Sequence, residues 1–192
     1  MMTHPQALPL RGLALALGLF LASSAVTRAA AAPEDLADDP LAYASAQDLQ
    51  AALTAGTLTA AELITRLETR VAAMNEAGPS LRAVRALNPE APAAAAASDA
   101  YRRSGSPRLL EGLPVLVKDN IETRDPLATT AGSTALLDNF AQQDSPVVAA
   151  LRAAGAIIFG KTNLSQWANF RSNDSISGWV CGGRAGTQSP CA

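Results

Sequence analysis

The chain has 192 residues, 48% of them hydrophobic and 17% charged, which is long and apolar enough for the core of one domain. A net charge of −2, without blocks of like charge, leaves no basic surface for nucleic acid, so we expect no nucleic-acid partner.

The first 32 residues have the pattern of a secretory signal peptide. Arg11 ends a mildly positive leader, residues 13–22 form an apolar run, and small residues follow at 29–32. The run is shorter than the roughly 20 residues of a membrane helix. We expect cleavage within 30–32, a periplasmic or secreted product, and no stable membrane span in the mature protein. An uncleaved anchor or a mistaken start codon is the alternative.

Several kinds of chemistry are excluded by residue type. The single histidine, His4, lies in the leader, which removes Ser-His-Asp catalysis, Cys-His catalysis and His-ligated zinc from the mature chain. A general base must then be Lys, Asp, Glu or Tyr. Phosphate and dinucleotide loops are absent from the sequence. Cys181 and Cys191 can pair in an oxidising compartment but do not make a metal site. We expect no metal and no cofactor.

The first half of the mature chain is predicted to be mainly helical. Residues 33–44 are acidic and flanked by prolines, which indicates a flexible linker. Two capping boxes then predict helix starts, Ser45 with Asp48 and Thr59 with Glu62. The first helix should end at 55 and the second before Gly78-Pro79, a strand is expected at 83–87, and an alanine-rich helix at 92–103.

From Gly112 the pattern changes to that of an α/β unit. Residues 113–117 are an apolar run of strand type, Ser145-Pro146 opens a helix that ends before Gly155, and residues 156–159 form a second apolar run. A strand, helix and strand at this spacing predict a βαβ crossover with parallel strands. Because neither run alternates with polar residues, we expect both strands to be buried between helices.

Two lysines follow these strands. Lys118 comes directly after residues 113–117, at the carboxyl end where sites form in open α/β sheets. Partial burial there favours a neutral amine, which can deprotonate a hydroxyl nucleophile. The alternative is an ion pair with Asp119 or another carboxylate. Lys161 has the same local setting after residues 156–160, and these arguments alone do not choose between the two lysines.

Four segments resemble the amidase signature family. They are G-L-P-V-L-V-K-D-N-I at 112–121, T-T-A-G-S at 129–133, G-K-T-N-L-S-Q-W-A-N-F-R at 160–171 and S-I-S-G-W at 175–179. The resemblance is strong over 112–179 and weaker back to about Ala42. It is greatest to exported peptide amidases and to the amidase-like component of glutamyl amidotransferases. It implies an α/β fold, with a mixed and largely parallel sheet flanked by helices, of which residues 45–179 would be the N-terminal part.

The resemblance also implies a Ser-cisSer-Lys mechanism of amide-bond hydrolysis, without cofactor, on a small-molecule or peptide amide. Lys118 would be the base, a cis serine would relay the proton, and a second serine would attack the carbonyl carbon. Gly132 and Ser133 would line the substrate cleft, although turn formation explains both equally well. Lys161 has no proton-transfer role in the family pattern and is interpreted as structural.

The chain departs from the family after Trp179. Residues 180–192 have lost the family register and form an aberrant or truncated tail, and neither catalytic serine is present. Ser175, Ser177 and Ser189 lie outside nucleophile motifs. We expect a fragment that is inactive alone and unstable, with an open edge at strand 157–159 that favours aggregation. The alternatives are a non-catalytic binding protein, or one subunit of a split amidase completed by a C-terminal fragment.

Overall fold

A computed structural model describes residues 39–169 of the chain. In chain order the elements are α2 (Ala46–Ala55), α3 (Ala60–Val71), β1 (Val84–Leu87), α4 (Ala91–Arg103), β2 (Pro114–Lys118), α5 (Pro146–Ala153) and β3 (Ile157–Thr162). The predicted signal peptide 1–32, most of the linker 33–44, Cys181, Cys191 and the tail 180–192 lie outside the described residues, so those expectations remain predictions.

Both predicted capping boxes are confirmed. Ser45 Oγ accepts from the backbone N–H of Asp48 at 3.2 Å, and Thr59 Oγ1 accepts from that of Glu62 at 3.1 Å. Each carboxylate in turn accepts from the backbone N–H of its cap residue. The second helix changes to a π-helical turn at Ala72–Glu76 before the chain leaves it. These local bonds set where α2 and α3 begin.

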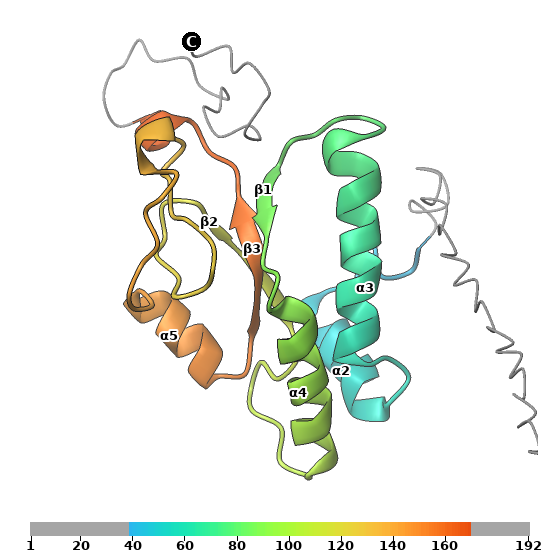
Figure 1. Cartoon of the computed structure of the whole chain (residues 1–192). Coiled ribbons are helices and arrows are strands. Elements are labelled where there is room, and N and C mark those ends of the chain that lie inside the picture. Colours follow the sequence, from blue (N-terminus) through green and yellow to red (C-terminus); the bar gives the residue numbers. More distant parts are fainter. Residues whose placement is uncertain (1–38, 170–192) are drawn as a thin grey trace, which may run out of the picture.

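The sheet is mixed and has the order β1-β3-β2 (Figure 1). Strands β2 and β3 are parallel and are joined through α5, so the predicted βαβ crossover is confirmed. Strand β1 pairs antiparallel with the other side of β3. The arrangement is the α/β architecture expected from the sequence.

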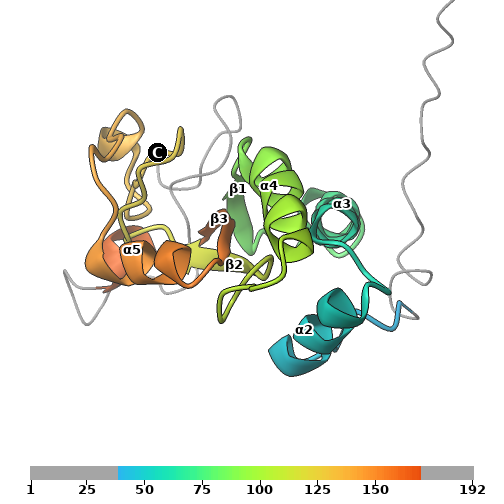
Figure 2. The same ribbon diagram turned by 90° about the horizontal axis from the view of Figure 1, so that it is seen from below.

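Helices cover the sheet from two sides. Helices α3 and α4 lie on one side of the sheet and α5 on the other (Figure 2). One core joins α2, α3 and α4 to β3, and its buried members include Leu63, Ile64 and Phe159. The smaller core on the α5 side is built from Val117, Val148 and Ile158. Neighbouring residues Ile158 and Phe159 thus pack into opposite layers, as strand alternation requires.

Two expectations about the strands are wrong. Strand 157–159 has no open edge, because β1 and β2 pair with its two sides and make β3 the central strand of the described sheet. The open edges in the part that the structure describes belong to β1 and β2. Strand β2 is also not fully buried: Val117 is covered by α5, whereas Leu116 is 37% exposed. An apolar run therefore marked a strand correctly but did not reveal its place in the sheet.

Helix α5 begins where the sequence predicted, but without the expected side-chain cap. Ser145 occupies the cap position and Pro146 the first turn, yet Ser145 Oγ is buried and bonds to none of the described residues. Its backbone N–H instead donates to the carbonyl of Glu122 at 3.0 Å. The helix start is therefore held by the neighbouring loop. In residues 39–169, none of the helices has the length and apolar character needed to cross a membrane.

Candidate active site

Lys118 is the last residue of β2, at the carboxyl end of a parallel strand. It is exposed, which differs from the partial burial that we expected. The reason is that β2 is an outer strand of the described sheet, and no described element packs over this side of its end. None of the ion pairs within residues 39–169 involves Lys118. Its amine is therefore open to a group brought to this strand end.

Asp119 does not pair with Lys118, the alternative that the sequence left open. Its carboxylate is fully buried, and Arg85 Nε lies 2.7 Å from Asp119 Oδ2. Arg85 Nε is not aligned for a hydrogen bond with any described residue, so the contact is mainly electrostatic. Thr130 adds its hydroxyl and, at 3.3 Å, its backbone N–H as donors. A buried carboxylate needs such partners, and here Arg85 and Thr130 provide them.

Lys161 differs sharply from Lys118. It lies inside β3 rather than after it and is fully buried. Its Nζ donates to the carbonyl of Ile121 at 2.5 Å and to Thr129 Oγ1 at 3.0 Å. Burial lowers the pKa of Lys161 to about 8, and the charge of Asp119 opposes this shift only in part. The similar sequence settings of the two lysines thus correspond to different structural environments.

Gly132 and Ser133 form a buried turn beside the end of β2. Gly132 adopts a φ of 72°, a left-handed conformation that suits glycine, and its N–H donates to Thr130 Oγ1 at 3.1 Å. Ser133 Oγ accepts from the N–H of Ala135 at 3.4 Å and begins a short 3-10 helix, Thr134–Leu136. Their role in the turn is therefore visible, and their role in binding substrate stays a prediction.

This turn is tied to the strand that bears Lys118. The N–H of Ala131 donates to the carbonyl of Asp119 at 2.9 Å, and the N–H of Asp119 donates to the carbonyl of Thr162 at 3.1 Å. The predicted base and the predicted substrate-binding turn are thus brought to the same end of the sheet. Carboxyl ends of parallel strands are where sites form in α/β folds.

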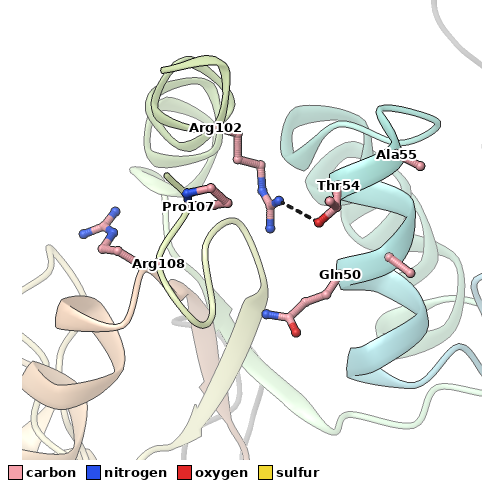
Figure 3. A pocket seen from close by; sticks show the side chains of 7 residues that line it. Gln50, Thr54, Ala55, Arg102, Pro107 and Arg108 are labelled. Carbon is pink, nitrogen blue, oxygen red and sulfur yellow. Dashed lines mark hydrogen bonds between the residues drawn. The ribbon is translucent and has the colours of Figure 1, made fainter. Parts of the chain in front are cut away.

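A second concavity lies elsewhere. A shallow hollow of about 510 Å³ lies between α2, α4 and the loop before β2. Figure 3 shows Arg102 of α4 bonded across it to Thr54 of α2, beside Gln50 and Arg108. The loop at 107–108 leads into the amino end of β2, so this hollow lies at the end of the strand away from Lys118. We do not assign the predicted chemistry to it.

Sequence reasoning missed Arg85, Thr129 and Thr130 as partners of the buried charges. An arginine within the expected strand 83–87 was the available signal, because a charge in an apolar strand needs a partner. Thr129 and Thr130 were noted only as members of a motif. Within residues 39–169, no three His, Cys, Asp or Glu side chains gather closely enough to hold a metal ion.

Comparisons with known proteins agree with this geometry. The family model named Amidase matches residues 63–180. The structure of peptide amidase from Stenotrophomonas maltophilia superposes with a TM-score of 0.71 at 51% identity, covering 75% of this chain and 30% of that one. A probable amidase of Arabidopsis thaliana is 40% identical over 146 residues, covering 74% of this chain and 28% of the relative.

A further relative has a different kind of name. It is one of the subunits of the glutamyl-tRNA(Gln) amidotransferase of Chloroflexus aurantiacus, and it is 41% identical over 128 residues, covering 66% of this chain and 26% of that protein. The chain spans about a quarter of the length of the curated relatives that it matches.

Proposed function

Because this chain belongs to the amidase signature family, we propose that it is the lysine-bearing N-terminal part of an amide-bond hydrolase. The observation that carries the proposal is the setting of Lys118. It ends a strand, lies within the motif at 112–121, and is exposed beside the Gly132-Ser133 turn with no ion pair to a described residue. An amine in that setting is available to accept a proton from a hydroxyl group.

The reaction would follow the Ser-cisSer-Lys scheme. Lys118 accepts the proton of a cis serine, which accepts the proton of a nucleophilic serine as its oxygen attacks the amide carbon. The amine or ammonia leaves with a proton returned along the same path, and water hydrolyses the acyl-enzyme ester. Backbone N–H groups stabilise the oxyanion of each tetrahedral intermediate. Gly132 and Ser133 line the cleft that holds the small-molecule or peptide amide.

The two serines would come from sequence that this chain does not carry. The relatives are about four times as long as the matched segment, which leaves room for them. We infer that the 192-residue chain is inactive alone, because members of a catalytic triad act as a unit. An open edge on β2 and the exposed Leu116 favour a complementing C-terminal part, supplied by a longer product or by a second polypeptide.

Export is the other part of the proposal. The pattern of residues 1–32 supports a signal peptide and a periplasmic or secreted location. A fusion of residues 1–44 to a reporter that folds only after export tests it. Activity of the reporter, with a new N-terminus between 30 and 33, is the expected result. A reporter that stays inside the cell with its leader uncut rules out this location.

A chimera tests the catalytic role. Residues 42–179 replace the matched segment of the S. maltophilia peptide amidase, and release of ammonia from a peptide amide is measured. We expect activity that falls at least about a thousandfold in Lys118→Ala. The matched control is Arg103→Ala, which removes an exposed cation from the end of α4 and should leave turnover intact. A folded chimera in which Lys118→Ala retains activity would refute the proposal, and one that binds the amide without turnover would favour a binding protein.

A further inference from the structure

Lys161 holds two distant points of the connection that follows Lys118. Its Nζ donates to the Ile121 carbonyl at 2.5 Å, near the start of this connection, and to Thr129 Oγ1 at 3.0 Å, near its end. The first acceptor lies 40 residues away in sequence and the second 32. One buried ammonium therefore fixes both ends of a long segment against the central strand.

The first of these bonds leads back to Lys118. The N–H of Ile121 donates to the carbonyl of Lys118 at 2.9 Å, while the Ile121 carbonyl accepts from Lys161. Lys161, Ile121 and Lys118 are thus linked by two consecutive hydrogen bonds. Peptide groups bonded on both sides polarise and order one another. The backbone of Lys118 is therefore restrained through Ile121.

The second bond leads to the predicted substrate turn. Thr129, which accepts from Lys161, precedes Thr130, whose side chain receives the N–H of Gly132 at 3.1 Å and donates to Asp119. The base and the turn are consequently restrained by the same ammonium, one from each end of the connection.

The choice of a lysine here is costly unless it serves a purpose. A buried ammonium loses its hydration, and in this protein it lies in no ion pair within 39–169 and binds two neutral oxygens. Burial accordingly lowers its pKa to about 8. A hydrocarbon side chain of similar length could fill the space without this penalty, but it could not reach both acceptors as a donor.

We propose that Lys161 is a positioning residue for the amidase reaction, which holds the backbone of Lys118 and the turn at Gly132 in one fixed relation. It touches neither substrate nor the reacting atoms and acts through Ile121 and Thr129. The inference rests on the proposed function, since it assigns the purpose of the restraint to catalysis by Lys118.

The first test is hydrogen exchange in the 192-residue chain. In Lys161→Met the amides of Ile121 and Ala131 should exchange about tenfold faster, as expected for loss of a buried hydrogen bond. Amides in α4 should keep their protection, which controls for global unfolding. Thr129→Val, which removes only the hydroxyl acceptor, should show the same change in weaker form, and Thr129→Ser should restore protection. Unchanged exchange at Ile121 and Ala131 in a folded Lys161→Met overturns the proposed restraint. If Lys161→Met does not fold, the Thr129 pair decides.

The second test is turnover in the chimera described above. Misplacement by a fraction of an ångström lowers turnover more than binding, so in Lys161→Met we expect kcat to fall about 10- to 100-fold with KM changed less than about threefold. Equal kcat in Lys161→Met and Arg103→Ala overturns the positioning role. If Lys118→Ala also stays active, the proposed function itself fails. Loss of activity in Lys118→Ala alone leaves that function standing and removes Lys161 from it.

Discussion

Lys118 and Lys161, the only two lysines of the chain, lie on opposite faces of the same sheet. Lys161 is paired in register with Val117, and Lys118 with Thr162, so the two side chains alternate across the pleat. Lys161 is fully buried on the face covered by α5, whereas Lys118 is exposed. Adjacent rungs of one ladder thus carry a sequestered cation and an accessible one.

The two lysines should differ in reactivity toward acylating reagents. We expect Lys118 to be acetylated rapidly and Lys161 at least about a hundredfold more slowly, because Lys161 reacts only when the chain opens. Mass spectrometry of peptides from a time course separates the two sites. In urea both should react alike, which is the control. Similar rates in the native chain would mean that Lys161 is not buried as described.

The stability of the fold should rise with pH above about 8. The pKa of Lys161 is lowered to about 8 from its ordinary 10.5, so between these values the unfolded chain binds more protons than the folded one. Stability then increases with pH, by at most about 1.4 kcal/mol per pH unit. Pulse proteolysis in urea at low protein concentration, from pH 7.5 to 10, measures the slope. Lys161→Met should lose this rise, and an equal slope in both proteins would contradict the prediction.

Acid should weaken the contact that joins α4 to the loop before β2. Burial by itself raises the pKa of Glu111, but hydrogen bonds from Arg108 and Ser98 outweigh it and hold the pKa below its ordinary 4.5. This stabilisation is therefore present above about pH 4.5 and is lost as the pH falls through the lower folded value. We expect Glu111→Gln to cost about 1–3 kcal/mol at pH 7.

The pH dependence supplies the check on Glu111. The difference between wild type and Glu111→Gln should shrink as the medium is acidified below pH 4.5, measured by the same proteolysis assay. A difference that stays constant down to pH 3 would show that the carboxylate charge does not contribute.

Gly160 should not tolerate a side chain. A Cβ at this position in β3 would lie 2.3 Å from the carbonyl oxygen of Ala86 in β1, a backbone atom that cannot move aside alone. We expect Gly160→Ala to destabilise the fold by at least about 3 kcal/mol, as an overpacked site in a central strand. Gly56→Ala is the control: it meets open space at a φ of 71°, so only about 1 kcal/mol of backbone strain applies. Circular dichroism of both variants compares them, and equal effects would refute the assigned contact.

The local elements were largely predictable from the sequence. Helix starts at Ser45 and Thr59 are decided by hydrogen bonds between residues three apart, which a sequence displays directly. The βαβ crossover follows from apolar runs and a Ser-Pro helix start. The motif at 112–121 also identified Lys118 at the end of its strand. Each of these depends on neighbours along the chain.

The partners of the buried charges were not predictable in the same way. Arg85 reaches Asp119 from a strand 34 positions earlier, and Thr129 meets Lys161 across 32. Pairing strand β1 antiparallel to β3 creates the first contact and also makes β3 central. Such contacts depend on the order of strands, which apolar runs do not encode.

The sequence by itself thus determined the family motif, the helix caps, the crossover and the candidate base. Only the tertiary structure decided which lysine is buried. Phe159 is an extra residue where β3 passes β2, and this shift puts Lys161 on the face of Ile158 and Val117. Regular alternation from Ile158 would have placed Lys161 on the opposite face. A one-residue bulge reverses every side chain beyond it, and its position is set by pairing between strands rather than by local sequence.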